Sequence, residues 1–332
     1  METTRRGFLK QAAAGAALAS FGADVLATQA PAGATGLPTR VLGRTGQRVS
    51  IVCLGGWHIG AVKDQAEAIR MMHAAVDEGL TFFDNCWEYH DGGAEEIMGR
   101  ALAGGRRDKV FLMTKNCERD YEGSMRCLDD SLRRLRTDRI DLWQFHEIIY
   151  DNDPDWVFDK GGMRAALEAQ KAGKVRYIGF TGHKDPRIHL AMLEKPFAWD
   201  ACQMPVNVLD LHYRSFQKQV VPVCAKNNVG VIGMKGFGGG AGIAGKAGLT
   251  AAEAYQYALS QPVASQVVGL TTMDQLKEIV ALARAFVPMT PAGQSALAAR
   301  VRDVATDGRF EQFKSTQSFD GPVHRRQHGF ST

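Results

Sequence analysis

The chain has 332 residues, of which 45% are hydrophobic and 23% charged, and its formal net charge at pH 7 is +4. This length and apolar content allow one large domain with a full core, or two modest ones. The small net charge, without long Lys or Arg runs in the body of the chain, argues against a nucleic-acid partner, and no apolar stretch reaches the roughly 20 residues of a membrane span.

Residues 1–30 have the pattern of an export signal. The sequence TRRGFLK at 4–10 closely matches the twin-arginine motif, and an uncharged, weakly apolar stretch follows over 12–23. Small residues then offer cleavage near Ala27 or Ala30. We predict a signal peptide that is recognised by the twin-arginine export machinery, which would make the mature protein periplasmic. The alternative is an ordinary amphipathic N-terminus with two chance arginines.

Residues 39–290 are predicted to form one domain of alternating strands and helices. Short runs rich in Val, Ile, Phe and Leu are typical of parallel strands buried on both faces. They lie at Val49–Leu54, Thr81–Asn85, Val110–Thr114, Ile140–Phe145, Val175–Phe180, Ala201–Val206, Gly230–Met234 and Gln266–Leu270. Segments with helical spacing separate them, which favours a (β/α)8 TIM barrel. A doubly wound sheet is the alternative, but residues 54–60 do not supply the GxGxxG that such a sheet usually needs.

Two segments flank the predicted barrel. Residues 39–50 contain two short apolar pieces around an Arg-Thr-Gly turn, which predicts a hairpin that could plug the N-terminal end. Residues 291–332 are predicted to be a C-terminal tail, either on the surface or as a cover over one mouth of the barrel.

Four residues of distinct chemistry follow the strand-like runs. Asp84, Tyr89, Lys115 and His146 each lie at or just beyond the C-terminal end of such a run. The C-terminal ends of parallel barrel strands share one rim, so these residues are expected to meet in space. Taken one at a time, each has a structural explanation: a helix N-cap for Asp84, a surface aromatic for Tyr89, a solvated lysine, and a buried structural histidine.

Together these residues suit the reduction of a carbonyl group. Hydride addition leaves charge on the carbonyl oxygen, which must be protonated or held by donors. We predict that Tyr89 is the general acid, that Lys115 lowers its pKa, that Asp84 holds Lys115, and that His146 donates to the oxygen. Loss of such an acid should reduce the rate by about 10²–10⁴.

The same motifs resemble those of the aldo/keto reductases, a family of nicotinamide-dependent barrel oxidoreductases. The resemblance runs from about Thr39 to about Phe286 and includes RVLGRTG at 40–46, GAEEIMGRAL at 93–102 and QMPVN at 203–207. It implies a small-molecule carbonyl substrate and NADP(H) as cofactor, with NAD(H) as the alternative. The implied cofactor residues are Gly56, Thr181, Gln203, Met234, Lys235, Gly236, Gly238, Thr271, Gln275 and Glu278. Trp57 and Trp87 are the implied substrate-binding residues.

The sequence departs from the family pattern at the cofactor site. An aromatic residue often stacks on the nicotinamide at the end of the seventh strand, where this chain has Met234. A Gly182-His183 pair replaces the expected Asn, and few cations lie near the last strand for a 2′-phosphate. A GxGxxG string within 240–245 is a weak signal by itself.

Two other functions remain open from the sequence. One is a metal-dependent hydrolase on the same barrel, since His58, Cys86, His90, Cys117, His146 and His183 lie near the predicted rim. Their spacing is not a known ligand motif, and the six scattered cysteines contain no CxxC pair, so the spacing predicts no metal site. The other is a non-catalytic, nucleotide-binding redox sensor.

Overall fold

The structure is a computed structural model that describes Leu26, Gln29 and residues 36–238 and 243–331. Nearly all of the predicted signal segment over 1–30, and residues 240–242 of the GxGxxG string, therefore lie outside the described residues. Among the described helices, none is long and apolar enough to cross a membrane.

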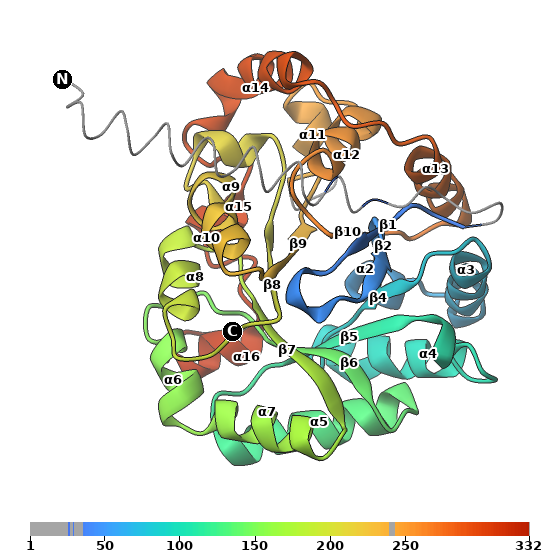
Figure 1. Cartoon of the computed structure of the whole chain (residues 1–332), viewed down its shortest axis with the longest axis vertical. Helices are drawn as coiled ribbons and strands as arrows, with labels where there is room; N and C mark the ends of the chain where they lie inside the picture. Colours follow the sequence, from blue (N-terminus) through green and yellow to red (C-terminus); the bar gives the residue numbers. More distant parts are fainter. Residues whose placement is uncertain (1–25, 27–28, 30–35, 239–242, 332) are drawn as a thin grey trace.

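Eight parallel strands close into a barrel in the order β10-β3-β4-β5-β6-β7-β8-β9. This confirms the predicted (β/α)8 fold (Figure 1). The barrel strands are β3 (Val52–Gly55), β4 (Phe82–Asp84), β5 (Phe111–Asn116), β6 (Ile140–Phe145), β7 (Val175–Thr181), β8 (Ala201–Pro205), β9 (Gly230–Met234) and β10 (Ser265–Val268). Their side chains are almost all buried, as expected for strands covered on the inside by the barrel core and on the outside by helices.

Helices surround the barrel in chain order. They are α2 (Gly56–Gly60), α3 (Gln65–Asp77), α4 (Gly93–Ala101), α5 (Tyr121–Leu135), α6 (Asp153–Asp159), α7 (Gly162–Lys171), α8 (Pro186–Leu193), α9 (Phe216–Gln219), α10 (Val221–Lys226), α11 (Ile243–Lys246), α12 (Ala251–Leu259) and α13 (Met273–Arg284). Short 3-10 turns are η1 (Gly43–Thr45), η2 (Tyr89–Gly92), η3 (Arg107–Lys109) and η4 (Leu209–His212). Side-chain caps start several helices. The Asp120 carboxylate, for example, accepts from Gly123 N at 2.8 Å at the start of α5.

The N-terminal hairpin is present and belongs to the barrel core. β1 (Thr39–Val41) and β2 (Arg48–Ser50) pair antiparallel, so Val49 lies in the hairpin, and the prediction that it starts the first barrel strand is wrong. Leu42 and Val49 pack with Phe82, Leu142 and Ile232 inside the barrel. Ile51 separates two strands that run in different sheets, which is why one continuous apolar run contains two elements.

The segment 291–332 forms three helices: α14 (Pro291–Ala305), α15 (Gln312–Ser315) and α16 (Pro322–Gln327). α14 packs through Leu297 and Val301 against the loop after β8 and against α12. α16 lies well away from α14 and beside α6 (Figure 1), where His328 stacks on Trp156 with 4.6 Å between ring centroids. The C-terminal segment therefore crosses the barrel from one side to the other.

Candidate active site

Asp84 and Lys115 form a buried ion pair at the C-terminal rim. Asp84 ends β4 and Lys115 lies in β5, and their side chains are 5% and 1% exposed. Lys115 Nζ donates to Asp84 Oδ1 and, at 2.7 Å, to the carbonyl oxygen of Asn85. Burial is the largest single influence and lowers the pKa of Lys115, but the charge and hydrogen bond of Asp84, together with Cys86 and Cys53, outweigh burial, so the net pKa is raised. Lys115 is therefore an ammonium group at neutral pH.

Tyr89, the first residue of η2, presents its hydroxyl to this ammonium. Lys115 Nζ lies 3.4 Å from the Tyr89 hydroxyl oxygen and 4.8 Å from the centre of its ring. Trp57 packs edge-on against the ring at 5.3 Å between centroids and is itself 51% exposed. The hydroxyl thus lies between a buried cation and an aromatic side chain that reaches solvent.

The pKa of Tyr89 is raised well above its ordinary value, contrary to the prediction that Lys115 lowers it. Burial is the main cause, and the charges of Asp84, Cys86, Glu147 and Glu88 add to it. Lys115 is already neutralised by Asp84, so little of its field remains for the phenol. Tyr89 is consequently protonated at neutral pH, which is the state that a proton donor needs.

His146 follows β6 directly and completes the group. Its backbone N–H donates to Asn116 O at 2.8 Å, which fixes the residue beside the end of β5. Its ring lies 5.9 Å from that of Tyr89, measured between centroids. Burial and then the Lys115 charge hold its pKa well below the ordinary range, so the imidazole is neutral. The structure therefore brings all four predicted catalytic residues together.

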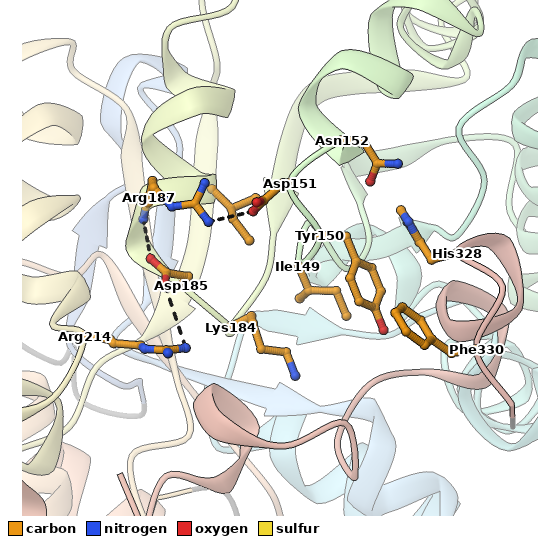
Figure 2. A pocket seen from close by; sticks show the side chains of 11 residues that line it. Ile149, Tyr150, Asp151, Asn152, Lys184, Asp185, Arg187, Arg214, His328 and Phe330 are labelled. Atoms are coloured by element: carbon orange, nitrogen blue, oxygen red, sulfur yellow. Dashed lines mark hydrogen bonds and ion pairs between the residues drawn. The ribbon is translucent and has the colours of Figure 1, made fainter. Parts of the chain in front are cut away.

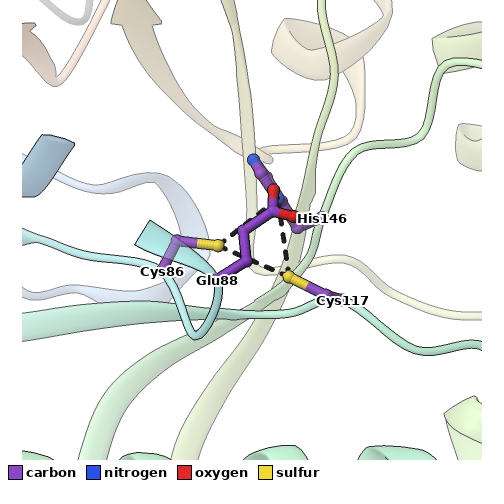
Figure 3. A group of neighbouring side chains, drawn as sticks. All are labelled: Cys86, Glu88, Cys117 and His146. Atoms are coloured by element: carbon purple, nitrogen blue, oxygen red, sulfur yellow. Dashed lines mark hydrogen bonds and ion pairs between the residues drawn. The ribbon is translucent and has the colours of Figure 1, made fainter. Parts of the chain in front are cut away.

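The Nδ1 atom of His146 also faces a cluster of side chains outside the tetrad formed by Asp84, Tyr89, Lys115 and His146. Cys86 Sγ lies 3.3 Å away, Cys117 Sγ 3.7 Å away and Glu88 Oε1 3.1 Å away (Figure 3). His324 of α16 reaches the same place, with its Nε2 3.4 Å from His146 Nδ1. This contact depends on the tertiary fold, which carries residue 324 across the rim. No local sequence pattern near His324 predicts it.

One of the predicted cofactor residues, Gln203, contacts the tetrad. Gln203, in the middle of β8, pairs in register with Thr181 at the end of β7, and both residues are buried. The Gln203 side chain accepts from Gln144 Nε2 at 2.8 Å and also hydrogen-bonds Asp84. The Gln203 amide therefore supports the ion pair directly.

The residues after β9 form a tight turn near this rim. Met234 ends β9, and Lys235 has a positive φ of 56°. Gly238 N donates to Lys235 O at 2.7 Å, and Gly236 lies inside this turn. Burial lowers the pKa of Lys235, although Glu147 and Asp320 oppose this shift. The Lys235 ammonium lies over the rings of Phe313 and Phe319, at 5.0 and 5.3 Å from their centroids.

Each of the other predicted binding residues contacts a different part of the fold. A side chain at Gly56 would lie 2.6 Å from Asp84 O, so glycine is required there by packing against the end of β4. Trp87 donates to Asp130 at 3.2 Å and lies under Arg134, so α5 holds its indole. Thr271, Gln275 and Glu278 are exposed at the start of α13, where Gln275 Oε1 accepts from Thr271 N at 2.8 Å.

A cavity of about 510 Å³ lies elsewhere on the rim, and no member of the tetrad lines it (Figure 2). Its charged groups already have partners, for example Arg187 with Asp151 at 2.7 Å and Lys184 with Asp320 at 2.6 Å. The cavity is lined by Ile149, Tyr150, Asp151, Asn152, Lys184, Asp185, Arg187, Ile188, Arg214, His328 and Phe330. The chemistry of the tetrad, and not this cavity, therefore identifies the candidate site.

Comparison with known proteins identifies the family of the chain. The sequence model of the aldo/keto reductase family matches residues 51–246. The chain is 33% identical over 223 residues to the uncharacterized oxidoreductase YrpG of Bacillus subtilis (strain 168), covering 60% of this chain and 66% of that protein. It is 30% identical over 213 residues to the aldo-keto reductase yakc [NADP(+)] of Schizosaccharomyces pombe, covering 59% and 60%. The matched part thus spans less than two thirds of either relative.

A solved structure is similar in fold. The aldo-keto reductase AKR11C1 from Bacillus halodurans, in its holo form, superposes with a TM-score of 0.69 and 24% identity, covering 82% of this chain and 99% of that one. With the family match covering more than half of its length, the chain belongs to the aldo/keto reductase family and has the TIM-barrel fold.

Proposed function

We propose that the protein reduces an aldehyde or a ketone with hydride from NADPH or NADH, and that Tyr89 is the general acid. One observation carries the proposal: Lys115 Nζ contacts both the Asp84 carboxylate and, at 3.4 Å, the Tyr89 hydroxyl. NADP(H) is the first choice because the Schizosaccharomyces pombe relative bears NADP(+) in its name. NAD(H) is the alternative.

The residues near β9 and β10 fit a polar cofactor group. Gln266 is fully buried, and neither atom of its amide group has a hydrogen-bond partner among the described residues. A side chain at Gly236 would lie 3.0 Å from Gln266 Nε2, so the glycine lets the turn pack closely beside this donor. Buried amides rarely remain unpaired. We infer that Gln266, the turn at Gly236 and Gly238, and Thr181 hold the cofactor.

A nicotinamide held there would supply the hydride for the carbonyl carbon. Tyr89 gives its proton to the carbonyl oxygen as charge develops there. Lys115, held in place by Asp84, stabilises the phenolate that remains, and the neutral His146 ring offers a second donor to the oxygen. Trp57, half exposed beside Tyr89, forms a wall on the side from which the substrate enters.

Replacing Tyr89 by Phe tests this function. We expect kcat with a reactive aldehyde and NADPH to fall by about 10²–10⁴, because the ring remains and only the acid is lost. Nucleotide binding, followed by quenching of protein fluorescence, should stay within about threefold of wild type, since no cofactor contact is removed. Tyr121→Phe, a matched change at a surface hydroxyl bonded to Glu168, is the control. A Tyr89→Phe enzyme with near-normal turnover would refute the assignment.

We also propose that residues 1–30 direct export and are removed near Ala27 or Ala30. The support is the order of motif, apolar stretch and small residues in the sequence. N-terminal sequencing of protein from the periplasm should give a start at residue 28 or 31. The double variant Arg5→Lys, Arg6→Lys should accumulate uncut inside the cell. Export of that variant at the wild-type level would contradict the proposal.

A further inference from the structure

Cys86, Glu88, Cys117 and His146 gather four ligand atoms in one buried place (Figure 3). Cys86 and Cys117 each lie two residues beyond the ion-paired residues Asp84 and Lys115. Both cysteines lie just beyond the ends of β4 and β5, and their sulfur atoms are 3.5 Å apart. His146 follows β6 at the neighbouring position and turns its Nδ1 toward both sulfur atoms.

Four of the six distances between these atoms match the edges of a tetrahedron around a metal ion. Bonds of about 2.3 Å to sulfur and about 2.0–2.1 Å to nitrogen or oxygen give edges of about 3.8 Å for S–S, 3.5 Å for S–N and 3.4 Å for N–O. The observed values are 3.5 Å between the sulfurs, 3.3 and 3.7 Å from sulfur to Nδ1, and 3.1 Å from Nδ1 to Glu88 Oε1. Each observed edge lies within about 0.3 Å of the expected one.

A second observation points to a missing cation. The Glu88 side chain is 8% exposed, and its Oε2 is buried without a hydrogen-bond partner among the residues that the structure describes. An ordinary network of thiols and imidazole would leave this carboxylate oxygen unsatisfied, which is costly. A disulfide does not account for the cysteines either, since the sulfurs are 3.5 Å apart and a bond needs about 2.05 Å.

We propose that Cys86, Glu88, Cys117 and His146 bind one divalent transition-metal ion, and that the donor set of two thiolates, one imidazole and one carboxylate fits Zn²⁺ best. Four protein ligands fill a tetrahedral shell, so this is a closed, structural site and not the open site of a hydrolase. The CxxC spacing typical of zinc sites is absent here, because Cys86 and Glu88 follow β4, Cys117 follows β5 and His146 follows β6.

The proposed site also has a consequence for His146, and this part rests on the proposed reductase function. A metal ion on Nδ1 leaves the ring proton on Nε2. Nε2–H is then a donor for the carbonyl oxygen. Without the metal, Nδ1–H would donate to Glu88, and Nε2 would be an acceptor. The metal ion would thus hold the histidine in the tautomer that the reaction needs.

Elemental analysis and cobalt substitution of the full chain test the site without any nucleotide. We expect about one zinc per chain, and in the Co²⁺ form a near-ultraviolet thiolate-to-cobalt band with intense visible bands of tetrahedral cobalt. Cys86→Ser and Cys117→Ser should each lower metal content at least tenfold at a fixed chelator concentration. Glu88→Gln should keep the thiolate band but shift the visible bands. Cys224→Ser, at a buried cysteine of the outer core, should bind metal as wild type does.

Three results would overturn the site. The first is equal metal content in Cys86→Ser and Cys224→Ser. The second is a reduced, cobalt-loaded wild type without a thiolate band. The third is metal-free native protein with a Cys86–Cys117 disulfide. Since Tyr89→Phe should retain the metal, failure of the reductase proposal leaves these readouts unchanged. If chelated wild-type enzyme keeps its full turnover, the inference about the tautomer fails and the site itself stands.

Discussion

At the scale of single residues, the site depends on a charge pair removed from water. Lys115 and Asp84 are almost fully buried, and the pair is surrounded by polar groups of the same rim, including Asn85 O and Gln203. Burying one unpaired charge is far more costly than burying a bonded pair. The pair is thus both a structural requirement and the means by which the Lys115 ammonium is held within 3.4 Å of the Tyr89 hydroxyl.

The difference in cost between an unpaired buried charge and a buried ion pair predicts the outcome of a double-mutant cycle. Asp84→Ala should lower the free energy of unfolding by about 3–5 kcal/mol, because Lys115 is left buried without a counter-ion. Adding Lys115→Met should recover most of that loss, since the remaining residue is apolar and of similar length. Urea denaturation of the single and double variants gives both values. A double variant that is less stable than Asp84→Ala would show that the pair is not coupled in this way.

At the scale of elements, the C-terminal segment is held to the barrel by buried charges. Lys314 of α15 is fully buried and donates to Asp210 at 2.7 Å, Glu311 at 2.8 Å and Tyr213 O at 2.8 Å. α16 then places His324 against His146. The segment predicted as a tail therefore contributes side chains to the rim.

Replacing Lys314 by Met should release this segment. Two carboxylates would remain buried without a cation, so we expect a loss of about 3–5 kcal/mol in stability and faster limited proteolysis after residue 305. Lys226→Met, at an exposed position of α10, is the control and should change stability by less than about 0.5 kcal/mol. Equal proteolysis rates for the two variants would contradict the anchoring role.

At the scale of the whole molecule, closure of the barrel buries several histidines in neutral form. Burial lowers the pKa of His183 to about 3, that of His324 to about 3 and that of His189 to about 4. His189 lies between the rings of Phe180 and Phe216, at 5.3 and 4.9 Å between centroids. The unfolded chain binds protons at these residues at a higher pH than the folded protein does, so acid favours unfolding.

The lowered pKa of His189 makes the free energy of unfolding fall as the solution becomes more acidic. Its pKa is 6.5 when unfolded and about 4 when folded, so its contribution is fully present above pH 6.5 and is lost as the pH falls toward 4. The loss amounts to roughly 3 kcal/mol. His189→Gln should flatten the fall in unfolding free energy between pH 6.5 and 4, measured by urea titration at each pH. An unchanged slope would mean that His189 is not neutral in the folded protein.

The sequence by itself determined the barrel and its rim. Buried parallel strands require continuous apolar runs, and the C-terminal ends of such strands must share one edge, so the order of residues along the chain is enough to place Asp84, Tyr89, Lys115 and His146 together. The boundary at Ile51 does not follow from the sequence, because an apolar run does not show where the chain leaves one sheet and enters another.

Only the tertiary structure decided what surrounds that rim. The elevated pKa of Tyr89 results from burial and from the sum of nearby acids, and neither quantity can be read from neighbours in the sequence. The meeting of Cys86, Cys117 and Glu88 at His146, with His324 beside them, depends on how loops and the C-terminal segment cross the barrel mouth. Contacts between residues so far apart in the chain are fixed by packing, which local sequence patterns do not encode.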